Sequence, residues 1–202
     1  GGSFGTGTTP ILFGEANVAN LVVGLEYLGS GAGSTSRALE LTNSQTSGTV
    51  LGITLELVNS GLGSVAFTSN ILNTGSNTGD LRTIRLTGTS TAANSIAGVD
   101  RLLGATTNLD KTGVGRWIIT GQSFHNGATN IVDGTLQLGN GGTAGSLATS
   151  SLINLGTTSS RLRTSRSNTL VIAQKITGGG GVEIANTAGG RTKWVFFLMR
   201  FH

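Results

Sequence analysis

Short apolar runs separated by glycine-containing turns constrain the fold of this chain more than any other feature. Residues 109–121 and 134–139 share one pattern, in which glycine flanks a short strand-like run such as Arg116-Trp117-Ile118-Ile119 or Thr135-Leu136-Gln137-Leu138. Runs of this length suit β-strands. Gly, Ser, Thr and Asn fill the intervals, and each is a poor helix former. No stretch keeps a period of 3.6 residues, so the sequence predicts an all-β protein.

The pattern repeats, which narrows the choice among all-β architectures. Looser echoes occur at residues 49–57 and 80–88, with roughly 20 to 30 residues between units, as expected for supersecondary elements that stack. With the glycine-rich, low-charge composition, this favours a β-solenoid over a sandwich or barrel. We expect roughly eight coils of about 25 residues in a rod near 40 Å long, at about 4.8 Å per coil. Inward positions are predicted for Leu136, Leu138, Leu170 and Ile172, and an outward one for Gln137.

Composition excludes several classes of protein. The chain has 34 glycines among 202 residues, no cysteine and only 11% charged residues, so it has neither disulfides nor thiolate metal sites. Its hydrophobic fraction of 37% is high for a disordered chain, although a low-complexity fragment that does not fold remains an alternative. A membrane helix needs about 20 apolar residues. The run at residues 194–199 is far too short, so no membrane span is expected.

Charge is distributed unevenly along the chain. Residues 1–80 carry one basic and five acidic residues, and the rest carries twelve basic and four acidic residues. The basic cluster that the sequence offers is Arg161, Arg163 and Arg166. On a strand, Arg161 and Arg163 share one face, which makes the three arginines a candidate contact for a polyanion such as an acidic glycan or lipopolysaccharide. The simpler interpretation is a solvated face. No aromatic residue interleaves with the cluster, so nucleic-acid binding is not expected.

Residues suited to catalysis or cofactor binding are scarce. The glycine tracts 29–33 and 178–181 lack the following helix and the Lys-Ser/Thr of a phosphate loop. Calcium needs oxygen ligands after the glycines, and Glu183 alone provides one there. His125 is the only histidine before the C-terminal residue, and its neighbours indicate an ordinary turn. The acidic residues are scattered, so we expect no catalytic residue, no metal, no cofactor, and no hydrolase or lyase activity.

A stretch in the second half of the chain resembles a known family. Residues 109–121 followed by 126–139 resemble the passenger-associated transport repeat of bacterial autotransporters, also called the autotransporter-associated β-strand repeat. A looser likeness extends to residue 190, through residues 166–170 and 176–181. The resemblance implies a right-handed parallel β-helix, export through the inner membrane, and display at the outer membrane or release from it. The family repeat has no catalytic or cofactor residues to transfer.

The resulting hypothesis is a structural, exported passenger segment that acts as a stalk or adhesin body and aids passenger folding and secretion. An extracellular polysaccharide-active enzyme on the same scaffold is the alternative. Expected partners are surface glycans, host or neighbouring-cell surfaces, and the C-terminal translocator barrel of a longer protein.

Residues 1–190 form the predicted solenoid, with 109–139 as the best-matching repeat. Residues 191–202 are basic and aromatic where the family would begin another glycine-rich strand. We expect a truncated or frame-shifted tail that either packs loosely over the last coil or stays disordered and promotes aggregation.

Overall fold

The fold consists of short β-strands. The computed structural model describes residues 7–14, 20–42, 52–74, 79–101, 103–147, 151–187 and 189–194. These residues form nineteen strands and no helix, which confirms the all-β class. Every strand pairing is parallel, a pattern that requires a crossover connection between paired strands.

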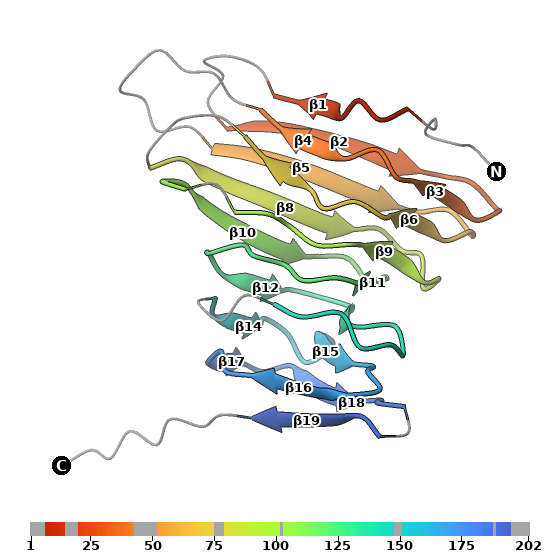
Figure 1. Cartoon of the computed structure of the whole chain (residues 1–202), viewed down its shortest axis with the longest axis vertical. Helices are drawn as coiled ribbons and strands as arrows, with labels where there is room; N and C mark the ends of the chain where they lie inside the picture. The colour runs from red at the N-terminus through yellow and green to blue at the C-terminus, as the bar shows by residue number, and fades with distance from the viewer. Residues whose placement is uncertain are drawn as a thin grey trace.

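Two seven-stranded parallel sheets form two sides of the molecule. The first sheet contains β2 (Leu21–Tyr27), β5 (Gly52–Asn59), β8 (Leu81–Thr87), β10 (Thr106–Lys111), β12 (Thr129–Ile131), β14 (Ile153–Leu155) and β17 (Ile176–Gly178). The second sheet contains β3 (Gly33–Thr35), β6 (Val65–Phe67), β9 (Asn94–Ile96), β11 (Arg116–Ile119), β13 (Thr135–Leu138), β15 (Arg161–Thr164) and β18 (Gly181–Ile184). In both sheets the strands follow chain order, so each circuit of the chain adds one strand to each sheet (Figure 1).

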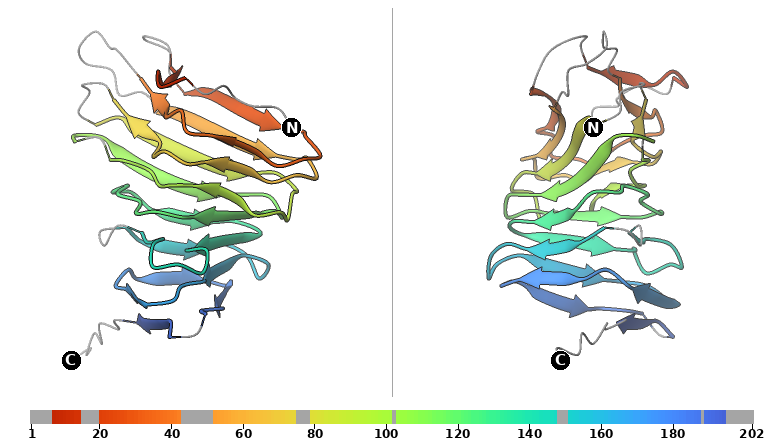
Figure 2. Two further views of the ribbon diagram at one scale, coloured as in Figure 1. Left: turned by 45° about the vertical axis from the view of Figure 1, so that its right-hand side comes forward. Right: turned by 90° about the vertical axis from the view of Figure 1, so that its left-hand side faces the viewer.

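The third side is less regular. It holds a three-stranded sheet of β1 (Ile11–Phe13), β4 (Leu39–Leu41) and β7 (Leu72–Asn73) at one end, and β16 (Thr169–Ile172) with β19 (Arg191–Trp194) at the other. Isolated parallel bridges join Ile71 to Val99 and Gln122 to Ser146 between them. The described residues therefore make a stack of coils, which Figure 2 shows from two sides.

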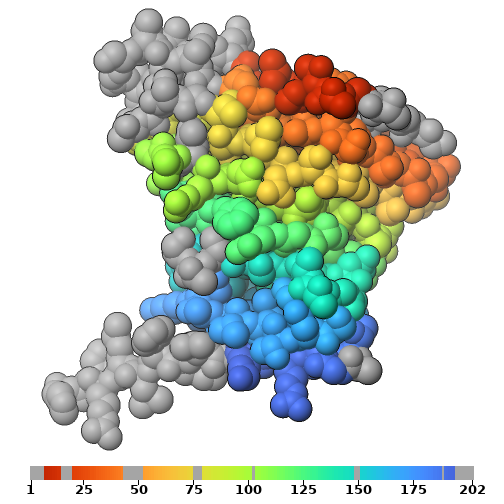
Figure 3. All heavy atoms as spheres, in the orientation of Figure 1, coloured from red at the N-terminus to blue at the C-terminus, as the bar shows by residue number. Residues whose placement is uncertain are grey.

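The stack narrows from the N-terminal to the C-terminal end. One circuit takes the first sheet from Leu21 to its partner Ile53, whereas a later circuit needs only the residues from Leu109 to Thr129. Strands of the first sheet shorten accordingly, from eight residues in β5 to three in β12. The space-filling view shows the wider upper coils above the narrower lower ones (Figure 3). The best-matching repeat therefore coincides with the narrowing of the stack.

Alternation along each strand places the core inside the coils. In β5 the buried Ile53, Leu55 and Leu57 alternate with half-buried Thr54 and Glu56, as a pleated strand requires. Coil stacking then aligns mainly aliphatic residues in inward rows, and one such row reads Leu55, Ile84, Leu109, Thr129 and Ile153. The inward positions predicted for Leu136, Leu138, Leu170 and Ile172 are confirmed, since all four are buried in the core.

Gln137, predicted to face outward, alternates with the core residues Leu136 and Leu138 but is buried. Only 3% of Gln137 is exposed, and its amide Nε2 donates to the carbonyl of Gly139 at 2.7 Å. Its register partner on β11, Ile118, is also buried although it alternates with two core residues. Period-2 alternation predicts direction but says nothing about whether other parts of the chain cover the outer face.

Glycine at the turns after the first-sheet strands has a steric cause. Gly113 and Gly134 both adopt φ of 67°, a left-handed conformation that glycine reaches without strain. A Cβ on Gly134 would lie 2.5 Å from the carbonyl oxygens of Gly113 and Gly115 in the preceding coil. Close stacking of successive turns therefore requires glycine here, which explains the glycine punctuation of the sequence.

The start of the C-terminal tail continues the third side. Residues Arg191–Trp194 form β19, which pairs in parallel with β16. Residues 195–202, which carry most of the predicted atypical tail, lie outside the described residues. The domain boundary at residue 190 stays a prediction.

Candidate interaction surface

Arg161 and Arg163 lie on the outer face of the second sheet. Both belong to β15, where they alternate with the buried Leu162 and Thr164. The Nη1 group of Arg161 donates to the carbonyls of Thr158 and Ser160, at 2.5 and 2.9 Å. These neutral acceptors orient the guanidinium group, and Arg161 has no ion pair in the part of the chain that the structure describes.

Arg163 is paired with the last strand of the sheet. Its Nε lies 3.3 Å from Oε1 of Glu183 on β18, without the alignment of a hydrogen bond. The two side chains are 30% and 51% exposed, so solvent screens the pair and its contribution to stability is small. Arg163 thus remains partly available to a ligand.

Arg166 has a different environment. It is only 7% exposed, and its guanidinium group donates to the carbonyls of Thr143 and Gly145 and to the side chain of Asn168. Burial lowers the pKa of Arg166. These contacts make Arg166 a structural clamp on residues 143–145, because the arginine fork satisfies several carbonyls at once. Of the three predicted arginines, the structure brings Arg161 and Arg163 together on the outer face and directs Arg166 away from it.

Arg116 is a further outer-face base that sequence reasoning missed. It occupies the outward first position of β11, and register joins it through Thr135 on β13 to Arg161 on β15. Its Nε is buried and has no hydrogen-bond partner in the described part of the chain. This alignment depends on coil lengths, so that two residues 45 positions apart in sequence are separated by a single strand, β13. The local pattern Arg116-Trp117-Ile118-Ile119 indicated a strand, but it did not show with which strand, or in which register, that strand pairs.

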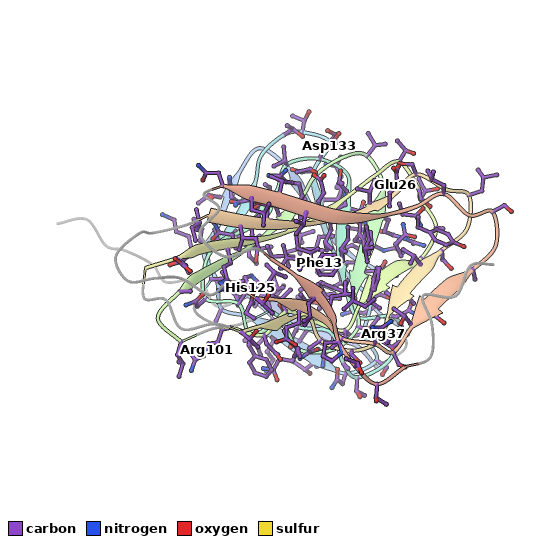
Figure 4. All side chains as sticks on the ribbon, turned by 90° about the horizontal axis from the view of Figure 1, so that it is seen from above. Phe13, Glu26, Arg37, Arg101, His125 and Asp133 are labelled. Atoms are coloured by element: carbon purple, nitrogen blue, oxygen red, sulfur yellow. The ribbon has the colours of Figure 1, made fainter. Side chains whose placement is uncertain are left out.

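His125, whose neighbours indicated an ordinary turn, is fully buried. Its Nδ1 lies 2.9 Å from Oγ of Ser123, and its Nε2 lies 2.8 Å from Oγ1 of Thr129. Burial lowers the pKa of His125 to about 4, so it is neutral at physiological pH. Seen along the stack, His125 and Phe13 lie within the ring of strands, whereas Asp133 and Arg101 lie on its rim (Figure 4). A histidine enclosed in this way positions its neighbours and does not meet a substrate.

Lys111 is the second buried base with an evident structural role. It takes an inward position between Leu86 and Ile131 in neighbouring coils. Its Nζ donates to the carbonyls of Thr112, Gly113 and Asp133, at 2.8, 2.7 and 3.1 Å. Burial lowers its pKa to about 8, and the Asp133 carboxylate opposes that shift. All three ammonium N–H groups therefore tie together two successive turns.

The carboxylates on the first sheet have partners of their own. Glu56 lies 3.3 Å from Arg85 in an ion pair, and Asp110 accepts a hydrogen bond of 2.8 Å from Asn130. Among the described residues, no group of three or more His, Cys, Asp or Glu side chains is placed to hold a metal ion. The part of the chain that the structure describes also contains no helix suited to crossing a membrane.

Comparison with known proteins gives one similarity that covers most of the chain. The chain is 36% identical over 168 residues to the adhesin BmaC autotransporter of Brucella suis biovar 1 (strain 1330). The aligned region covers 80% of this chain but only 4% of that adhesin. No protein-family profile matches the chain, and no solved structure matches it. The chain is thus similar to a short segment of a much longer autotransporter adhesin.

Proposed function

We propose that this chain is a segment of an exported, adhesin-like autotransporter passenger, built as a right-handed parallel β-helix that serves as a stalk or adhesin body. The observation that carries the proposal is the 36% identity to an autotransporter adhesin across 80% of the chain. The parallel stacked sheets support a β-helix, and parallel crossover connections are right-handed in nearly all proteins.

The architecture suits a stalk because each coil packs mainly on its neighbours. Each added coil lengthens such a rod by about 4.8 Å and packs on the preceding coil in the same way. Glycine is abundant and only 11% of the residues are charged, a composition that suits an extended structural segment. We infer that the segment lies at the cell surface or outside the cell, and that a translocator elsewhere in the longer protein exports it.

A polysaccharide-active enzyme on this scaffold is the less favoured alternative. Such enzymes use a pair of carboxylates flanking the scissile bond. On the first sheet Glu56 and Asp110 are separated by Arg85 in the register, and both carboxylates are engaged as described. Release of reducing or unsaturated ends from pectin, xylan or alginate by the purified chain would overturn the non-enzymatic proposal.

Surface exposure tests the proposal directly. A peptide tag inserted after Gly142 should be tolerated, because residues 142–144 are exposed and exposed loop tips accept insertions. An insertion at this point leaves the contacts of Arg166 with Thr143 and Gly145 on one side of the tag. In the full-length protein of the source bacterium, an antibody should label the tag on intact cells. The control is a cytoplasmic protein carrying the same tag, labelled only after permeabilisation. Labelling of the passenger that also requires permeabilisation would contradict export.

A further inference from the structure

We propose that the outer face of β11, β13 and β15 binds an acidic polysaccharide chain through Arg116, Arg161 and Arg163. The inference rests on the proposed function only in that an exported segment encounters such polymers. The occupant is an extended polymer with carboxylate or sulfate groups.

The three arginines form a short track on one face. Arg161 and Arg163 are two residues apart on the same strand, about 7 Å along it. Arg116 and Arg161 lie in one register row with Thr135 between them, which places their strands about 10 Å apart. The row crosses the strands and so runs along the axis of the stack. An extended chain can follow it, whereas a compact ligand would meet only one or two of the bases.

The register row continues beyond Arg161 to a residue without a side chain. The next residue in the row is Gly181 on β18, which has no side chain to project over the face. The Arg161 side chain lies across this glycine, since a Cβ there would come within 3.2 Å of Arg161 Cδ. Thr135, within the row, adds a half-buried hydroxyl that can hydrogen-bond to a sugar.

Two of the three arginines on this face have no ion pair among the described residues. The other outer-face arginine with a described ion pair, Arg85, is matched by Glu56 at 3.3 Å, whereas neither Arg116 nor Arg161 has an ion pair among the described residues. Two acidic residues flank the track. Glu183 lies beside Arg163, and Asp133, in the turn before β13, accepts hydrogen bonds from Gly134 N and Ser159 Oγ.

The surrounding coils strengthen the positive field. Residues 151–187 and 189–194 carry six bases and one acid: Arg161, Arg163, Arg166, Lys175, Arg191 and Lys193 against Glu183. Because stacking converts sequence position into axial position, the uneven charge of the sequence becomes a basic end of the rod. A field of one sign attracts polyanions and speeds their association.

Guanidinium chemistry selects the ligand. Its planar fork binds carboxylate and other oxyanions through paired hydrogen bonds. The track has no aromatic residue in its register rows for bases to stack on, and single-stranded nucleic acids depend on such stacking. An acidic polysaccharide therefore fits the face better than a nucleic acid does.

The test uses polygalacturonate as the probe and the purified chain. Binding measured by calorimetry at low salt should weaken by roughly tenfold or more in the double variant R161Q/R163Q and should decrease as salt rises. The matched control is R85Q/R101Q, which lowers the net charge equally. Arg85 is 34% exposed on the first sheet, close to the 30% of Arg163, and Arg101 is also exposed. The control should retain near-normal binding.

A gain-of-binding variant guards against loss by misfolding. E183Q removes the acid beside Arg163 and should tighten polygalacturonate binding several-fold. An equal loss in R161Q/R163Q and R85Q/R101Q would show a non-specific charge effect and overturn the proposal. So would unchanged binding in R161Q/R163Q, no binding of the parent chain, or tighter binding of single-stranded DNA than of polygalacturonate. Surface labelling of the Gly142 tag is independent of these variants, so its failure would contradict the proposed function and not the binding face.

Discussion

The buried His125 predicts a loss of stability in mild acid. The imidazole is fully buried between Ser123 and Thr129, and burial lowers its pKa from 6.5 to about 4. Because the folded-state pKa lies below the unfolded one, the unfolded chain binds the proton more readily between these two values. Stability is therefore fully present above pH 6.5 and is lost as pH falls towards 4.

The magnitude follows from the size of the shift. Each pH unit within the window corresponds to about 1.4 kcal/mol per proton. Between pH 7 and pH 5, the free energy of unfolding of the coil that holds His125 should drop by about 2 kcal/mol, and by about 3 kcal/mol once the folded pKa is reached. Most carboxylates titrate below pH 5, so the upper part of the window isolates the histidine.

Hydrogen exchange of residues 121–131 between pH 7 and pH 5, corrected for the intrinsic exchange rate, measures this local free energy. H125Q is the matched control, because glutamine can hydrogen-bond but does not titrate. It should remove the pH dependence while His202 remains. If the parent protein keeps its protection factors unchanged down to pH 5, or if H125Q shows the same acid loss, the reasoning about His125 is refuted.

Four further predictions follow from other contacts. K111M should lower the free energy of unfolding, measured by urea denaturation, by about 2–3 kcal/mol, since three turn carbonyls lose a charged donor. The control K175M changes an exposed lysine and should have little effect in the same assay. W117F should lower the free energy of unfolding by about 1 kcal/mol, because it keeps an aromatic ring near Phe67 but loses the hydrogen bond from Nε1 to Thr87 O at 3.0 Å. W117A, which also removes the ring, should lower it by about 3–5 kcal/mol in the same assay. G63A should destabilise the fold clearly, since its Cβ would lie 1.7 Å from the Gly31 carbonyl oxygen, whereas G142A meets nothing within 4 Å; equal urea midpoints would contradict this. Deleting residues 109–128 should leave a folded, shorter stack, as judged by circular dichroism, because Thr129 then takes the register position of Leu109. Deleting residues 109–127 should unfold the stack, because a one-residue shift turns the inward side chains of the strand to its outer face.

Local sequence patterns predicted much of the architecture. Alternation in β13 and β16 predicted the inward Leu136, Leu138, Leu170 and Ile172 correctly, because a strand's pleat alone decides which side chains share a face. Trp117, in the strand-like run 116–119, is 1% exposed. The repetition of glycine at turns predicted stacked coils, since Gly113 and Gly134 leave no room for a Cβ between successive turns.

The sequence by itself thus determined the all-β class, the direction of side chains within a strand, and the uneven charge along the chain. Only the tertiary structure decided which strands pair, and with them the environment of particular polar residues. Burial of Lys111, for example, depends on Leu86 and Ile131 in the neighbouring coils, which no local pattern reports. The same holds for the arginines. Strand register places Arg116 and Arg161 in one row, whereas Arg166 donates hydrogen bonds to the carbonyls of Thr143 and Gly145 in another turn. The physical reason is that period-2 alternation is a property of one strand, whereas register and covering depend on the length of every intervening coil.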